Sequence, residues 1–233
     1  MIIIQPQVLV PEAELDPGKM EKLERYARVC YKSEDKMDTT TRQAGSFLKG
    51  LMKRGHESII EHEKITVLFI IDRGISHEIV RHRIAAYSQE STRYCNYSRD
   101  RFGQEITLIE PFFFLDDQKA YELWCHSCML AEKNYMALLA AGRSAQEARS
   151  ILPNSLKTEI VVSYNMREWR HFFRLRCDMA AHPQMRQVAI PLLLLFRERF
   201  PFLFEDIAYD RAFPSEYYGQ IVLTDELFRP RQS

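Results

Sequence analysis

Residues 64–94 read KITVLFIIDRGISHEIVRHRIAAYSQESTRY, and this stretch combines an apolar run, a mixed run and a dense group of arginines. Lys64–Ile71 is rich in β-branched residues and predicts a strand. Ile75–Ile84 predicts a helix that follows the strand directly. The polar segment that contains Arg81-His82-Arg83 leaves the end of this helix and continues to Tyr94.

The rest of the chain predicts more helices and one more long strand. Helices are expected over Glu21–Tyr31, Thr40–Arg54, Gln118–Ala141, Ser144–Leu152, Met166–Cys177 and Gln184–Phe200, and a strand over Leu156–Tyr164. Strands and helices are interspersed without a regular βαβ alternation, which favours an α+β fold with a mixed or antiparallel sheet and several long helices. With 233 residues and 46% hydrophobic content, the chain is expected to form a single domain over residues 1–233.

Charge and composition argue against several classes of protein. Lys+Arg and Asp+Glu number 32 each, whereas a general nucleic-acid binder is usually basic, so we expect no nucleic-acid partner. The start, MIIIQPQVLV, lacks the features of a signal peptide, and the longest apolar run, Val188–Phe196, is too short to span a membrane. Five cysteines without an export signal indicate reduced thiols, so a cytoplasmic protein without a membrane partner is expected.

Several common site motifs are absent or incomplete. No GxG occurs for a dinucleotide fingerprint, and the glycines with phosphate-loop spacing are not followed by lysine. The HExxH order is missing around Glu57–His62, so no metal site is expected there. Cys125-x-x-Cys128 lies in a helical pattern, where small core residues are common, and a redox role stays open. Ser91 lacks the GxSxG elbow of a serine nucleophile and is interpreted as a hydroxyl for a ligand oxygen.

Five arginines and no lysine lie between Arg81 and Arg101, accompanied by the acids Glu90 and Asp100. One interpretation is a solvated basic loop. The other is an anion pocket, because a planar guanidinium matches phosphates and carboxylates. The arginines are interleaved with residues able to stack on a flat ring: Tyr87, Tyr94 and Tyr97.

Residues 167–176, REWRHFFRLR, form a second arginine cluster. On a helix of about 100° per residue, Arg176 falls among aromatic side chains. The opposite face carries Arg167, Arg170, His171 and Arg174. An unpaired buried charge is costly, so Arg176 needs a partner. That partner is either an acid, such as Glu159 or Asp178, or an anionic or polarisable ligand, and helix geometry alone leaves both open.

The spacing of the first cluster resembles the signature of the flavin-dependent thymidylate synthases: RHR, seven residues, Ser, one residue, Arg-Tyr. Here it is Arg81-His82-Arg83 with Ser91, Arg93 and Tyr94. The resemblance continues over most of the chain, through Gly55-His56-Glu57-Ser58, Ala148-Arg149, Asn165-Met166-Arg167 and Leu175-Arg176. It implies an enzyme that converts dUMP to dTMP, with carbon from methylenetetrahydrofolate and a hydride from FAD that NADPH reduces. It also implies a homotetramer whose active sites lie between subunits.

The resemblance implies a set of site residues, position by position. Those expected to contact dUMP are Glu78, Arg81, Gln89, Glu90, Ser91, Thr92, Arg93, Arg149 and Arg176. Those expected to contact FAD are Ser58, Arg81, His82, Arg83, Gln89, Asn165, Arg167, His171 and His182. Arg176 matches the arginine thought to polarise the uracil ring, where a cation stabilises negative charge that develops on the pyrimidine, so it is the expected catalytic residue.

Some positions depart from the family pattern. Glu78 stands where Gln is also found, and it is expected to face a ribose hydroxyl or a neighbouring arginine, because an ionised Glu78 would repel the phosphate. Gln89 and Glu90 replace an acid followed by an apolar residue, and His171 stands where Asn occurs. The stretch before His182 looks longer than in some relatives. Rival hypotheses are a non-catalytic nucleotide- or flavin-binding assembly protein and a different flavoprotein on the same scaffold.

Overall fold

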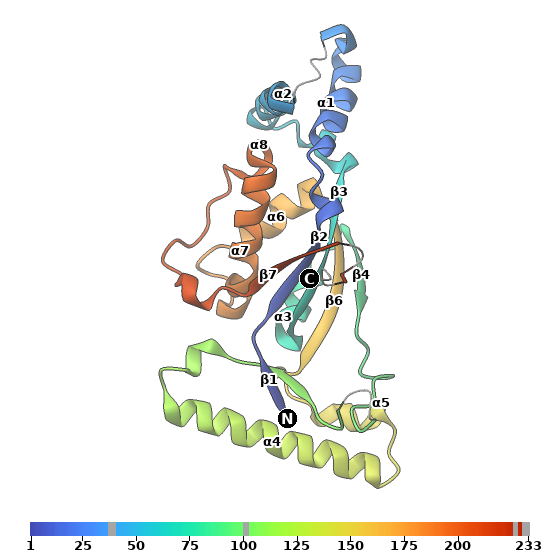
Figure 1. Cartoon of the computed structure of the whole chain (residues 1–233), viewed down its shortest axis with the longest axis vertical. Helices are drawn as coiled ribbons and strands as arrows, with labels where there is room; N and C mark the ends of the chain where they lie inside the picture. The colour runs from blue at the N-terminus through green and yellow to red at the C-terminus, as the bar shows by residue number, and fades with distance from the viewer. Residues whose placement is uncertain (37–40, 100–102, 226–227, 230–233) are drawn as a thin grey trace.

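A computed structural model describes residues 1–36, 41–99, 103–225 and 228–229 of the chain. A central sheet runs along an elongated molecule, with helices at both ends and along one side (Figure 1). The strands are β1 (Ile2–Ile4), β2 (Gln7–Pro11), β3 (Lys64–Asp72), β4 (Ala85–Gln89), β5 (Thr107–Ile109), β6 (Lys157–Asn165) and β7 (Gln220–Thr224). The helices are α1 (Gly18–Tyr31), α2 (Thr41–Lys53), α3 (Arg73–Ile79), α4 (Gln118–Ala140), α5 (Ala145–Ala148), α6 (Met166–Arg176), α7 (Pro183–Arg199) and α8 (Pro201–Phe204).

The main sheet has the strand order β4-β6-β3-β2-β7. All its pairs are antiparallel except β2 with β7, and β1 forms a small separate sheet with β5 in parallel. β3 and β6 pair from Lys64 opposite Asn165 to Asp72 opposite Lys157, so these two strands form the centre of the sheet. The predicted α+β class with a mixed sheet is confirmed.

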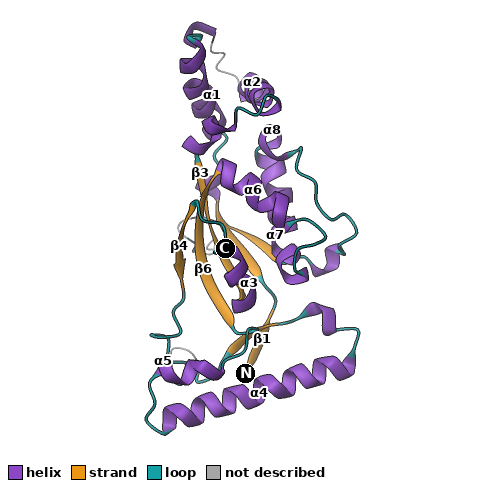
Figure 2. Ribbon diagram, turned by 180° about the vertical axis from the view of Figure 1, so that it is seen from behind, coloured by secondary structure: helices purple, strands orange, loops and turns teal. Residues whose placement is uncertain are grey.

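One face of the sheet forms the core. Along β3, Ile65, Val67, Phe69 and Ile71 are buried, alternating with half-exposed residues, as the period of two in a strand requires. This face packs on the aromatic side of α6, where the rings of Phe69 and Phe172 lie 6.2 Å apart. α3 lies behind the sheet in Figure 1 and in front of it in Figure 2, and no α-helix of the described residues covers the opposite face.

The predicted helix over Ile75–Ile84 is wrong in its second half. α3 ends at Ile79, residues 80–84 form a turn and irregular backbone, and the edge strand β4 begins at Ala85. The carbonyl oxygen of Ile79 accepts hydrogen bonds from the hydroxyls of Tyr87 (2.9 Å) and Tyr164 (3.2 Å). These tertiary contacts satisfy the helix end, and they come from residues that the helical period does not reveal.

Most other predicted elements are confirmed within a residue or two. The predicted Ser144–Leu152 helix is instead the short α5 followed by a 3-10 turn over Arg149–Ile151. β1, β2, β5 and β7 were not predicted. The five cysteines are free thiols, and among the described helices none has the length and hydrophobicity to span a membrane. Thr40, Asp100 and Arg101, which belong to the predictions above, lie outside the described residues.

Candidate functional site

Helix α6 is the platform of the candidate site. It begins directly after β6, and the side chain of Asn165 caps it by accepting a hydrogen bond from the backbone N–H of Glu168 at 2.8 Å. Trp169, Phe172 and Phe173 are fully buried on its inner side. The amphipathic pattern therefore fixes the helix rotation, so that its polar side borders solvent.

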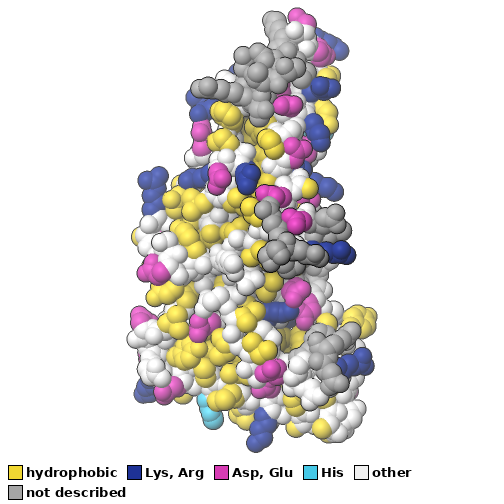
Figure 3. Space-filling model, in the orientation of Figure 1, with side chains coloured by type: hydrophobic (Ala, Val, Ile, Leu, Met, Phe, Trp, Pro, Cys, Tyr) yellow, Lys and Arg dark blue, Asp and Glu magenta, His cyan; other side chains and the backbone are white. Residues whose placement is uncertain are grey.

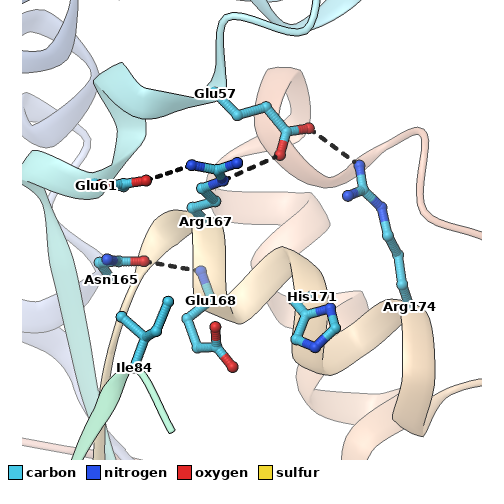
Figure 4. Close-up of a pocket in the computed structure, with 8 residues that line it drawn as sticks. All are labelled: Glu57, Glu61, Ile84, Asn165, Arg167, Glu168, His171 and Arg174. Carbon is cyan, nitrogen blue, oxygen red and sulfur yellow. Dashed lines mark hydrogen bonds and ion pairs between the residues drawn. The ribbon is translucent and has the colours of Figure 1, made fainter. Parts of the chain in front are cut away.

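A cavity of about 450 Å³ opens along this polar side (Figure 4). Its lining comprises Glu57, Glu61, Ile84, Asn165, Arg167, Glu168, His171 and Arg174. Arg167 donates to Glu61 at 2.5 Å and Arg174 donates to Glu57 at 3.2 Å, so both guanidinium groups are held by carboxylates at the rim. Three of the predicted flavin residues, Asn165, Arg167 and His171, are thus brought together.

A second cavity of about 350 Å³ adjoins the first through Arg167, which lines both. Ser58, another predicted flavin residue, lines this second cavity together with His56 and Tyr31. The Tyr31 hydroxyl lies 2.9 Å from His56 Nδ1. The segment from His56 to Glu61 therefore borders the same groove as the start of α6, although about a hundred residues separate them in sequence.

Arg170 departs from the helical-wheel interpretation. It is buried rather than open to the cavity, and its two terminal nitrogens bind the carboxylate of Asp206 at 2.7 Å each. It also donates to the Leu203 carbonyl and, at 3.4 Å, to Glu57. The Arg170–Asp206 ion pair joins α6 to the segment after α8, and it thereby stabilises the helix that carries the cavity residues.

Arg176 donates hydrogen bonds to three acceptor atoms on the other side of α6. Its Nη1 donates to the Glu78 carboxylate at 2.9 Å, and its Nη2 donates to the Glu78 backbone oxygen at 3.0 Å. Its Nε donates to His82 Nε2 at 3.1 Å. The acid partner is therefore Glu78, not Glu159 or Asp178, and the expectation that Glu78 faces a neighbouring arginine is met.

His82 links this arginine to the cavity. Its Nδ1 lies 3.0 Å from Glu168 Oε1, and its side chain is buried. Because the Nε of Arg176 can only donate, His82 Nε2 must carry the lone pair and Nδ1 the proton. Burial, followed by the charge of Arg176 and the proximity of His171, lowers the pKa of His82 to about 4, whereas burial raises the pKa of Glu168. His82 is therefore neutral at pH 7.

Ligand atoms of His82, Glu168 and His171 lie within 4.8 Å of one another, a spacing that metal sites share. Two features disfavour a cation. Arg176 already occupies the lone pair of His82 Nε2, and its positive charge lies beside the three residues. We interpret the group as a hydrogen-bonded network.

A third cavity, of about 350 Å³, borders α3 and is lined by two of the predicted nucleotide residues, Thr92 and Arg149. Arg149 donates to the Thr92 hydroxyl at 3.3 Å. Arg73 and His77, both on α3, also line it, and sequence reasoning did not select them. The signal available in the sequence was their spacing of four residues on the predicted helix, which puts both on one face.

Two other predicted nucleotide residues, at the end of β4 and directly after it, have internal partners. Gln89 donates to the hydroxyls of Ser76 (2.9 Å) and Thr158 (3.2 Å). Glu90 accepts from the Tyr97 hydroxyl at 2.9 Å and pairs with Lys157 at 3.0 Å. These contacts order the segment that precedes Ser91.

Several predicted residues lie outside these groups. Arg81 and Arg83 are exposed, and neither forms an ion pair with a described residue. Ser91 Oγ accepts from the backbone N–H of Arg93 at 3.3 Å, and the exposed Arg93 lies over the ring of Tyr94. His182 caps α7 by accepting from the Gln184 N–H at 3.2 Å, with its ring against Phe113. For all predicted residues, ligand contact stays a prediction.

Comparison with known proteins identifies relatives over most of the chain. The family profile described as "Thymidylate synthase complementing protein" matches residues 13–202. A flavin-dependent thymidylate synthase of Geobacter sulfurreducens is 35% identical over 185 residues, which cover 77% of this chain and 78% of that enzyme. A flavin-dependent thymidylate synthase of Corynebacterium aurimucosum is 33% identical over 213 residues, 83% of each chain.

One solved structure shares the fold. A UMP/dUMP methylase, PolB, from Streptomyces cacaoi, bound with 5-Br dUMP, superposes with a TM-score of 0.74. The alignment covers 88% of this chain and 96% of that one, at 18% sequence identity. At that identity, the likeness concerns the fold.

Proposed function

The chain belongs to the flavin-dependent thymidylate synthase family, and on that premise we propose that it methylates dUMP to dTMP. We propose methylenetetrahydrofolate as carbon donor, FAD as the flavin and NADPH as its reductant. The product would supply dTTP biosynthesis. One observation carries the proposal: Arg176 joins a network from Glu168, in the first cavity, to Glu78 on α3, whose neighbour His77 lines the third cavity.

The chemistry of the first two cavities suits FAD. Arg167, Arg174 and the hydroxyl of Ser58 offer donors for a diphosphate, and Ile84 offers an apolar surface for a flat ring. On binding, the diphosphate would replace the carboxylates of Glu57 and Glu61 as the partner of these arginines. When bound, the reduced flavin supplies a hydride.

Arg176 would act on the pyrimidine. A fixed cation beside the ring stabilises negative charge as it develops, and it needs no reorganisation at the moment of reaction. Glu78 holds the guanidinium from one side and His82 from the other. Arg149 and Thr92, in the third cavity, would bind the nucleotide, and we assign Ser91 a binding hydroxyl.

We propose a homotetramer with active sites between subunits. Arg81 and Arg83 are exposed cations without described ion pairs, which suits contact with an anion held by another subunit. The uncovered face of the sheet carries half-exposed Leu68 opposite Val161. Figure 3 shows hydrophobic side chains across the middle of the surface in the same view. We also propose a cytoplasmic location.

The test is a single turnover. Purified protein is loaded with FAD, reduced, and mixed with dUMP and methylenetetrahydrofolate in the absence of oxygen. We expect flavin reoxidation together with dTMP. Protein that takes up no flavin would exclude both flavin hypotheses, and flavin uptake without dTMP would favour the non-catalytic assembly protein. A parallel reaction with UMP tests the choice of sugar, because the structural neighbour is named for both nucleotides.

A further inference from the structure

Glu168 is buried beside the first cavity. Its side chain borders the cavity that the flavin is proposed to fill, yet its Oε1 lies 3.0 Å from His82 Nδ1. A buried carboxylate without a specific partner is unfavourable, so this single strong contact determines where the side chain lies.

The contact with Glu168 favours the same His82 tautomer as the contact with Arg176. A carboxylate can only accept unless it is protonated, so Glu168 favours the tautomer with hydrogen on Nδ1. That tautomer leaves a lone pair on Nε2, where the Nε of Arg176 donates at 3.1 Å. In the other tautomer two N–H groups would face each other, and Arg176 would lose this partner.

Arg176 is then fixed in its plane by contacts at all three guanidinium nitrogens. Glu78 holds Nη1 and Nη2, and His82 holds Nε. Removing the contact at Nε leaves the guanidinium free to rotate about its links to Glu78. A misplacement of about 1 Å can reduce rates about a hundredfold in an active site.

We propose that Glu168 is a positioning residue that acts through His82 to hold Arg176 in the orientation that the pyrimidine requires. The expected effect on dUMP binding rests on the proposed function, whereas the contacts among Glu168, His82 and Arg176 do not depend on it. The charged and titratable groups that face His82 are Glu168, His171 and Arg176 from α6, with Tyr164 from β6; Tyr87 from β4 donates to its backbone oxygen.

The first test measures the tautomer of His82 directly. Nitrogen-15 NMR of histidine-labelled, ligand-free protein, with His82→Gln for assignment, reports which ring nitrogen is protonated. We expect Nδ1–H in the wild type and a weaker preference for it in Glu168→Leu, where only Arg176 still favours this tautomer. A wild-type His82 protonated at Nε2, or at both nitrogens at pH 7, would overturn the proposal even if the Leu variant failed to fold.

The second test measures dUMP affinity of the flavin-loaded protein by calorimetry. Glu168→Leu should weaken binding about tenfold, while Glu168→Gln, which keeps an acceptor oxygen, should weaken it less than about threefold. The matched control Glu198→Gln makes the same acid-to-amide change at an exposed position of α7 and should bind dUMP as the wild type does.

A double-mutant cycle separates positioning from general support. In an Arg176→Ala background, Glu168→Leu should change dUMP affinity less than about twofold, because the residue through which it acts is gone. A tenfold loss that persists in that background would refute the proposal and indicate a structural role. If the wild type bound no dUMP, the proposed function would fail while the NMR result still decided the role of Glu168.

Discussion

The Arg170–Asp206 ion pair predicts different effects of removing its buried and its exposed partner. The Arg170 side chain is 2% exposed, whereas that of Asp206 is 55% exposed. Removing Asp206 leaves a buried cation with only the Leu203 carbonyl and a 3.4 Å contact to Glu57. Removing Arg170 leaves a carboxylate that water can reach.

The structure gives the relative size of the two effects. Breaking a buried pair from its exposed end costs about 3–5 kcal/mol, and the remaining contact to Glu57 reduces the expected cost of Asp206→Ala to about 2–4 kcal/mol. Arg170→Met keeps most of the packing and loses mainly the donor to the Leu203 carbonyl, so we expect about 1–2 kcal/mol. At about 2–4 °C per kcal/mol for a chain of this size, Asp206→Ala should melt several degrees below Arg170→Met.

Thermal unfolding at matched protein concentration and flavin content measures this difference, because ligand and subunit association raise the apparent stability. Glu205→Ala is the control: it removes the neighbouring acid, whose partner Lys49 is also exposed, and should cost less than about 1 kcal/mol. If the melting temperature of Arg170→Met were equal to or below that of Asp206→Ala, the reasoning would be contradicted. The cost of an unpaired buried guanidinium would then not be the larger of the two effects.

Three further predictions concern the Arg176 network. Arg176→Ala should abolish dTMP formation while size-exclusion chromatography shows the tetramer unchanged; loss of the tetramer would make this arginine structural. Glu78→Gln removes the acid that neutralises Arg176 and should tighten dUMP binding by up to about fivefold in calorimetry, whereas weaker binding would mean that Glu78 itself contacts the nucleotide. The folded pKa of His82, about 4, lies below its unfolded value of 6.5, so stability is lost as pH falls through this window. Between pH 7 and 5 the wild type should lose about 1–2 kcal/mol more than His82→Gln in urea unfolding; equal losses would show that His82 is not buried as a neutral base.

The long elements could be predicted because their local patterns agree with their tertiary surroundings. Lys64–Ile71 alternates in burial as its β-branched residues predict, and Met166–Cys177 buries the aromatic stripe that its helical period predicts. β1 and β5 each have only three residues. Strands of that length exist because a partner distant in sequence pairs with them, so no local pattern reports them.

The membership of the candidate site stays a prediction, whereas the pairing of its charged side chains could not be predicted from the sequence. The arginine clusters supplied Arg81 and Arg176 as candidates and the family resemblance added Arg149, yet the partner of Arg176 was left open between a ligand and an acid such as Glu159 or Asp178. Glu78 holds that place because α3 ends at Ile79 and turns its last carboxylate toward α6. Which acid meets which arginine depends on where two helices end, and those ends are set by tertiary hydrogen bonds.

The side-chain directions of Arg81, His82 and Arg83 explain why this segment is not helical. In a helix these three side chains would point about 100° apart, and no two would share a face. In the structure the burial alternates from exposed to buried to exposed, the period of an extended chain. His82 thereby reaches Glu168 and Arg176 inside, while both arginines stay outside, free to meet an anion. The hydroxyls of Tyr87 and Tyr164 donate to the Ile79 carbonyl at the end of α3. They therefore help to separate the buried network of His82 from the exposed arginines.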